Sequence, residues 1–274
     1  MEERTNEAVA APTRIINVLW TGGWDSTFRV MDLIANHDCT VQPHYVADNV
    51  ARKSWQVELA TMEKIRAMCE SEPGRFSGRL AEPIVYWRGD IPKLPNLAES
   101  YAAMRGISYL GPQYEWLASL AEFRKLPPLE LPVHRQDRTF NILAENVELR
   151  PGWPTDTFVV SPTAPEYLKV FRYFEFPLLQ MTKPEMEKAA SKYGFGDILE
   201  ATWFCHTPIS GPRPCGVCKP CRYTIADGMG RRVGWRGMIR FYTVGTALDY
   251  CPHDVRRWAS WQWQKIQNLR VSRQ

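Results

Sequence analysis

The chain has 274 residues, enough for a large domain with an extension and for a substantial buried core. Its hydrophobic fraction of 45% is ordinary for a globular protein, and no apolar run reaches the roughly 18 residues of a membrane-spanning helix. The net charge of +4 is uneven, because residues 231–274 carry nine Lys/Arg against two Asp. The sequence therefore predicts no membrane-spanning helix and places the basic surplus in the C-terminal region.

Strand-like and helix-like segments alternate through the first half of the chain. Residues 1–13 are polar, lack the apolar core of a signal peptide, and are expected to form a flexible tail. Buried-strand patterns follow at 14–20, 40–48 and 83–87, and helical patterns at 26–36, 54–70, 96–104 and 112–125. This alternation predicts an α/β fold with a parallel sheet covered on both faces.

The second half of the chain is less regular. The proline-rich stretches 125–140 and 148–167 predict loops, and residues 174–180 predict a strand end. Residues 182–195 predict a helix in which Thr182 and Glu185 form a capping box. Residues 254–270 predict a terminal helix that packs on the core or on a second copy in a homodimer.

The stretch TGGWDST, Thr21–Thr27, lies between the first predicted strand and a helix that Ser26 is expected to cap. Free amides and the helix dipole make such a junction an anion site, and two glycines let the backbone curl around the anion. Ser26 and Thr27 would donate to phosphate oxygens, and Asp25 would hold Mg²⁺. The alternative is a plain tight turn, and the stretch matches neither the Walker nor the dinucleotide pattern.

TGGWDST resembles the SGGxDS signature of the PP-loop (N-type) ATP pyrophosphatases, with Thr21 in place of serine. The resemblance implies a Rossmann-like fold of the adenine nucleotide alpha hydrolase (HUP) type and cleavage of ATP between the α and β phosphates. It implies catalytic roles for Asp25 and Ser26. It also implies a nucleotide site made by Thr21, Gly22, Gly23, Trp24, Asp25, Ser26 and Thr27.

Four of the seven cysteines fall within seventeen residues, at Cys205, Cys215, Cys218 and Cys221. This spacing is typical of a closed, structural zinc site with four thiolate ligands. An iron–sulfur cluster is an alternative, although its usual spacings differ, and His206 competes with Cys205 as a ligand. An odd cysteine count without an export signal favours a reducing cytoplasm over a disulfide framework.

The stretch TWFCHTPISGPRPCGVCKPCR, together with the N-terminal loop, resembles the 7-cyano-7-deazaguanine synthases (the QueC family). The resemblance covers roughly residues 14–228. It implies a domain at 14–229 with a zinc knuckle at 205–221, followed by a basic, tryptophan-rich extension at 230–274. It also implies conversion of 7-carboxy-7-deazaguanine and ammonia to the nitrile with ATP and Mg²⁺, the four cysteines holding zinc.

Two stretches depart from that family. Gln113-Tyr114 replaces an Arg-Asn pair, so a guanidinium that would clamp a carboxylate is absent there; Arg135, Arg138 or Arg172 are candidate substitutes. The family's run after the second strand is also replaced. Asp48 there is either a ribose contact or a solvated loop acid. These changes and the basic extension favour, as an alternative, a relative repurposed for antiphage defence that joins deazaguanine to a protein or nucleic-acid partner. A zinc-knuckle binding protein without catalysis is a third hypothesis, against which the intact GGxDS pattern counts. Thiolation of tRNA is a further alternative, for which Cys39 and Cys69 are weak sulfur carriers.

Overall fold

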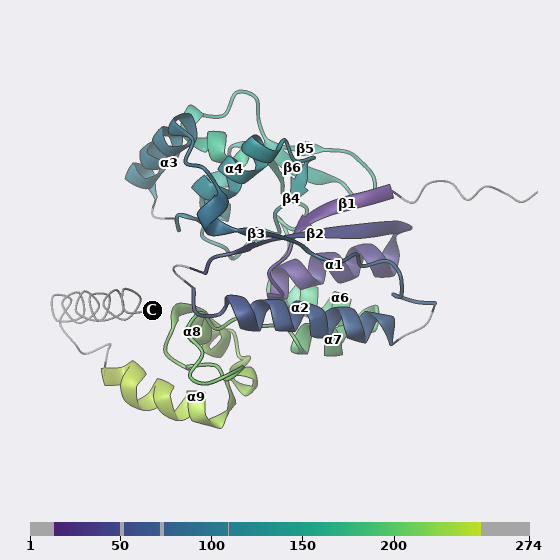
Figure 1. Cartoon of the computed structure of the whole chain (residues 1–274), viewed down its shortest axis with the longest axis vertical. Helices are drawn as coiled ribbons and strands as arrows, with labels where there is room; N and C mark the ends of the chain where they lie inside the picture. The colour runs from purple at the N-terminus through teal and green to yellow at the C-terminus, as the bar shows by residue number, and fades with distance from the viewer. Residues whose placement is uncertain (1–13, 50–51, 72–73, 109, 248–274) are drawn as a thin grey trace, which may run out of the picture. The chain divides into compact units, whose positions relative to one another are not determined.

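The structure is a computed structural model of the chain, and it describes residues 14–49, 52–71, 74–108 and 110–247. The chain divides into two compact units, Met1–Trp203 and Phe204–Gln274 (Figure 1). The predicted tail at 1–13 and terminal helix at 254–270 lie outside the described residues. The division into a domain at 14–229 and an extension at 230–274 stays a prediction.

A five-stranded parallel sheet forms the centre of the first unit. Its strands, in the order β3-β2-β1-β4-β7, are β3 (Ile84–Trp87), β2 (Cys39–Ala47), β1 (Arg14–Leu19), β4 (Leu129–Glu130) and β7 (Phe174–Glu175). The register of β1 against β2 runs from Arg14–Cys39 to Leu19–His44. The prediction of an α/β fold with a parallel sheet is confirmed.

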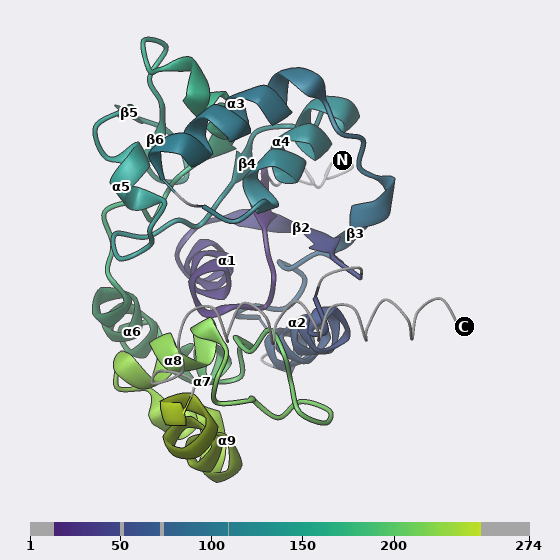
Figure 2. The ribbon, with the colours of Figure 1, turned by 90° about the vertical axis from the view of Figure 1, so that its left-hand side faces the viewer.

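Helices cover both faces of this sheet (Figures 1 and 2). One face carries α1 (Trp24–Asn36), α2 (Trp55–Glu70), α6 (Lys183–Lys192) and α7 (Gly196–Glu200), and the other carries α3 (Pro95–Ile107) and α4 (Gln113–Arg124). Short helical segments lie at Arg88–Asp90 (η1), Phe140–Leu143 (α5) and Glu166–Phe171 (η2). The capping box of Thr182 and Glu185 at the start of α6 is confirmed.

Two of the stretches predicted as loops contain strands, so that prediction is wrong there. β4 is a two-residue strand inside 125–140. Its Glu130 is buried, and Arg29 of α1 compensates the buried charge by donating to both carboxylate oxygens at 2.7 Å. An antiparallel hairpin, β5 (Val147–Arg150) and β6 (Thr157–Val160), occupies much of 148–167. Neighbouring prolines, which end or limit sheet pairing, hid these short strands.

The described part of the second unit is a small helical fold. It contains α8 (Lys219–Ala226), η3 (Gly230–Val233), α9 (Gly234–Arg240) and a π-helical turn at Phe241–Gly245 (η4). Within Phe204–Ala247, the buried hydrophobic residues are Cys205, Cys215, Cys221, Met229 and Val233. No helix in the described ranges is long and apolar enough to cross a membrane.

Candidate functional site

The loop between β1 and α1 turns sharply at Gly22, whose φ of +67° is a left-handed conformation that glycine adopts without strain. A Cβ at Gly22 would also lie 3.3 Å from side-chain atoms of Thr61 and Met62 of α2. The Gly22 carbonyl accepts a hydrogen bond from the Trp203 amide at 2.8 Å. Backbone conformation, close packing and this hydrogen bond therefore fix the loop.

The helix cap differs from the predicted one. Gly23 is the N-cap of α1, and Ser26 lies inside the first turn, where its Oγ donates to the Gly23 carbonyl at 3.3 Å. The prediction of Ser26 as the cap is wrong, because the helix begins at Trp24, two residues earlier than expected. Since no side chain caps this end, the amides and partial positive charge of the helix start remain available to an anion.

A cavity of about 190 Å³ lies beside this loop, at the carboxyl end of β1. Of the predicted site residues, Thr21, Gly23, Asp25 and Ser26 line it, whereas Gly22, Trp24, Thr27 and Asp48 do not. Thr27 is fully buried, and its Oγ1 accepts a hydrogen bond from Trp20 Nε1 at 2.9 Å. Asp48 directly follows β2. In an open parallel sheet, this edge is the usual place for a ligand.

Asp25 is the acidic group of the loop that lines the cavity. Its Oδ1 is buried without a hydrogen-bond partner among the described residues, and its Oδ2 lies 3.7 Å from His134 Nε2. Burial raises the pKa of Asp25 above its ordinary value, although His134 and Lys183 oppose that shift through their charges. An ionisable oxygen held in this way is a ready donor atom for a cation.

The cavity also contains a guanidinium that the sequence pattern did not reveal. Arg52, which follows β2, lines the cavity and donates from Nη2 to Gln113 Oε1 at 3.0 Å. The next residue, Tyr114, is buried, and its hydroxyl bonds Thr139 Oγ1 at 2.6 Å. Arg52 therefore brings positive charge to the position of the missing Arg-Asn pair. Its place after the carboxyl end of a strand was the available signal.

Other polar residues of the wall were not anticipated either. His44 of β2 bonds Tyr86 Oη at 3.0 Å and Asn17 Oδ1 at 2.9 Å through its two ring nitrogens. Burial lowers the pKa of His44, so the ring is neutral near pH 7. Asp137 also lines the cavity. By contrast, Arg135, Arg138 and Arg172 are not among the lining residues.

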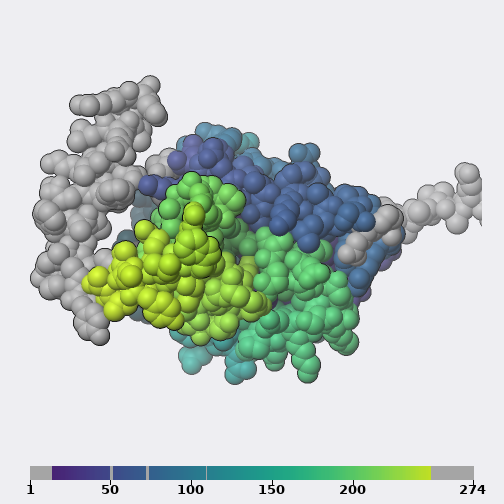
Figure 3. All heavy atoms as spheres, turned by 90° about the horizontal axis from the view of Figure 1, so that it is seen from below, coloured from purple at the N-terminus to yellow at the C-terminus, as the bar shows by residue number. Residues whose placement is uncertain are grey.

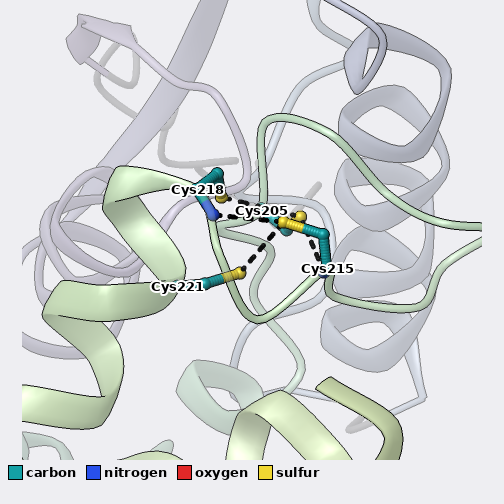
Figure 4. Close-up of side chains that lie close together, drawn as sticks. All are labelled: Cys205, Cys215, Cys218 and Cys221. Atoms are coloured by element: carbon teal, nitrogen blue, oxygen red, sulfur yellow. Dashed lines mark hydrogen bonds between the residues drawn. The ribbon is translucent and has the colours of Figure 1, made fainter. Parts of the chain in front are cut away.

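The four predicted cysteines meet in the second unit, and their sulfur atoms all lie within 4.8 Å of one another (Figure 4). The Cys215–Cys221 and Cys205–Cys218 sulfur pairs are both 3.9 Å apart. The Cys215 amide donates to Cys205 Sγ at 3.2 Å, and the Cys218 amide donates to Cys215 Sγ at 3.3 Å. These residues could hold a metal ion.

The four thiols lie close enough to shift one another's pKa. Hydrogen bonds with Cys205 lower the pKa of Cys215 and Cys218. Hydrogen bonds with the neighbouring thiols raise the pKa of Cys205 and Cys221. A thiolate is the form of cysteine that binds metal.

A larger cavity of about 330 Å³ lies elsewhere in the first unit. Residues Ile15–Asn17 of β1, the residues around β4, and the loop of the β5–β6 hairpin line it. It contains none of the predicted site residues. The smaller cavity is the candidate site because Asp25, Arg52 and the residues of the β1–α1 loop line it.

No known family model matches the sequence, and no curated protein is a detectable relative. Among solved structures, the U34-tRNA thiolase NcsA from Methanococcus maripaludis, with its [4Fe-4S] cluster, is 12% identical, with a TM-score of 0.39, over 90% of this chain and 76% of that chain. A 4-thiouridine synthetase in complex with RNA and bound ATP is 13% identical, with a TM-score of 0.32, over 80% of this chain and 50% of that chain. Likenesses this distant assign neither a family nor an activity.

Proposed function

We propose that the chain is an ATP-dependent enzyme that adenylates a carboxylate and then forms a C–N bond. The observation that carries the proposal is the loop of the β1–α1 junction. Gly22 forms a turn just before a helix start that no side chain caps, and the partly buried Asp25 lines a cavity that Arg52 also lines. The resemblance of TGGWDST to the PP-loop signature supports ATP as the nucleotide.

The loop suits the pyrophosphate part of ATP. The first amides of α1 and the helix dipole would bind its oxygens, and the hydroxyls of Thr21 and Ser26 line the same space. Asp25, through its buried and unpartnered oxygen, would hold Mg²⁺, which would neutralise phosphate charge. The structure of this loop therefore favours stabilisation of a departing pyrophosphate.

The chemistry requires activation, because a carboxylate would have to expel oxide. In the proposed first step, a carboxylate oxygen attacks the α phosphorus, the bond between the α phosphorus and the bridging oxygen breaks, and pyrophosphate leaves. An amine then attacks the carbonyl carbon, loses a proton to solvent and expels AMP, giving an amide. The chain's own contribution is to position the reactants and to stabilise charge.

The best candidate acceptor is 7-carboxy-7-deazaguanine, with ammonia as the amine and a second adenylation leading to the nitrile. Arg52 supports an anionic acceptor, since its guanidinium lines the cavity where the family-like Arg-Asn pair is missing. Gln113 orients this guanidinium through the 3.0 Å hydrogen bond. Catalytic roles for Asp25 and Ser26 belong to this proposal.

We assign zinc to the cysteine cluster. Tetrahedral zinc with Zn–S bonds of about 2.3 Å places its sulfur ligands roughly 3.8 Å apart. The two 3.9 Å sulfur pairs agree with that separation. A cubane cluster spreads its four thiolates over four separate iron atoms, so a set this compact favours one ion. With four thiolates the site has no open position and is structural.

The test is mass spectrometry of products after incubation of the protein with ATP, Mg²⁺, 7-carboxy-7-deazaguanine and ammonia. We expect AMP, pyrophosphate and the nitrile, all absent with Asp25→Ala. AMP and pyrophosphate without a nitrile would support adenylation but reject this acceptor. The next products to seek would be a modified protein carboxylate and a conjugate of deazaguanine with a protein or nucleic acid. No AMP from zinc-loaded protein with any acceptor would reject the enzyme and leave the binding-protein alternative.

A further inference from the structure

The second unit is strongly basic within its described residues, 204–247. Residues 204–247 contain seven Lys/Arg and a single acid, Asp227. Zinc with four thiolates would add a charge of −2, which leaves a formal net charge of about +4 on a very small fold. Arg213, Lys219, Arg231 and Arg236 are exposed. This unit therefore presents a concentrated positive charge that catalysis in the first unit does not require.

One helical face adds large exposed apolar side chains to that charge. Trp235, Ile239 and Tyr242 are 68%, 54% and 66% exposed, and they follow one another at intervals of four and three residues along α9 and η4. This spacing puts them on one side of the helix, with Trp235 and Tyr242 roughly 10 Å apart along its axis. In Figure 3, α9 and the adjoining turn form a continuous part of the unit's surface, in yellow-green.

The arginines near this face are oriented by specific contacts. The Arg236 guanidinium lies 5.0 Å from the centre of the Trp235 ring, and the Arg232 guanidinium lies 5.2 Å from that of Phe204. Arg240 donates from Nε to the Cys215 carbonyl at 3.1 Å. A backbone contact also joins the knuckle to α9, since a Cβ on Gly216 would lie 1.9 Å from the Gly237 carbonyl oxygen. The segment with the four cysteines therefore packs directly against α9 and fixes its position.

We propose that the face of Trp235, Ile239 and Tyr242, with its surrounding arginines, binds single-stranded nucleic acid. Exposed aromatic rings spaced along a basic surface provide stacking platforms for bases, while guanidinium groups pair with the phosphates. Unpaired bases are needed for such stacking, so a single strand fits this surface better than a duplex does. An acidic protein would match the charge, but stacked bases would use the exposed aromatic rings and the positive charge together.

This inference is independent of the proposed ATP chemistry. The two can be separated with Asp25→Ala, which alters only the cavity of the first unit. We expect this variant to bind nucleic acid as the unmodified protein does, even though it makes no AMP. Loss of nucleic-acid binding in Asp25→Ala would overturn the independence of the surface.

The test is fluorescence anisotropy of a labelled single-stranded RNA of about 12 nucleotides, within the usual range of site sizes, with the full chain. We expect binding that weakens steeply as the salt concentration rises. Trp235→Leu should lower the affinity for the RNA at least five-fold, whereas Trp235→Phe should largely preserve it. The leucine variant keeps the apolar bulk but removes the ring, so the pair isolates stacking. Zinc content and melting temperature check that each variant is folded.

Charge is tested by comparing Arg236→Glu with Lys188→Glu, a change at another exposed position, on α6 of the first unit. We expect only Arg236→Glu to weaken binding. Equal losses in both would indicate a nonspecific charge effect and overturn the assigned surface. Full competition by poly-glutamate, tighter binding of duplex, or unchanged binding in Trp235→Leu would each overturn the single-strand proposal.

Discussion

Asp25 has opposite effects on stability and on the proposed function. Burial raises its pKa above the ordinary 3.8, so the folded protein prefers the protonated form. The favourable contribution is therefore complete below about pH 4 and is lost as pH rises through the raised pKa, where the partly buried carboxylate ionises at a cost that its remaining exposure to solvent reduces. That ionised form is nonetheless the one that would hold a cation.

We predict that Asp25→Asn raises the melting temperature by a few degrees at pH 7 and much less near pH 4, because the amide does not ionise. Calorimetry at both pH values measures the difference. Mg²⁺ with ATP should stabilise the unmodified protein more than the variant, which should form no AMP. If Asp25→Asn is less stable than the unmodified protein at pH 7, ionisation of Asp25 does not destabilise the fold and this explanation is wrong.

At the scale of elements, α1 and β4 are joined by a buried ion pair. Arg29 is 2% exposed and Glu130 is 6% exposed, and they make two hydrogen bonds of 2.7 Å. Because removal of one partner strands a buried charge, Arg29→Met should cost about 3–5 kcal/mol of unfolding free energy. Urea denaturation measures this cost. The double variant Arg29→Met with Glu130→Met should recover most of the lost unfolding free energy. An equal loss in the single and the double variant would show that an unpaired buried Glu130 is not the cause.

The contact between the cysteine knuckle and α9 depends on a glycine. Gly216 and Gly228 have nearly the same φ, +77° and +78°, but a Cβ would meet backbone only at Gly216. Gly228→Ala should cost ~1–2 kcal/mol from backbone strain alone. Gly216→Ala should cost roughly 3 kcal/mol or more and weaken metal binding, because α9 must move. Thermal melts and zinc titration compare them, and similar results for both would argue against the close contact.

What the sequence revealed depended on how local each signal was. The capping box of Thr182 and Glu185 spans four residues, and the four cysteines span seventeen, so both were predictable. The ion pair of Arg29 and Glu130 joins residues 101 positions apart, and the two-residue β4 has no periodicity of its own. Likewise, only the fold brings Arg52 to Gln113, 61 positions away.

At the scale of the whole molecule, the two units differ in what stabilises them. The first unit has an extensive apolar core around its sheet, including Leu97, Leu129 and Phe171. In the described part of the second unit, three of the five buried hydrophobic residues are cysteines of the cluster. Within the described residues 204–247, this little hydrophobic burial is insufficient for a stable fold, so metal binding should supply most of their folding free energy.

We therefore predict that a strong chelator unfolds the second unit and leaves the first folded. Limited proteolysis should then cut within 204–247, whereas a fragment ending near Trp203 should persist; mass spectrometry identifies both. Cys221→Ser should give the same pattern without chelator, and restored zinc should protect only the unmodified chain. Cysteines 39 and 69 are buried outside the cluster, so Cys39→Ser provides a matched control that should retain zinc. Simultaneous loss of both units on chelation would show that the metal stabilises the chain as one cooperative structure.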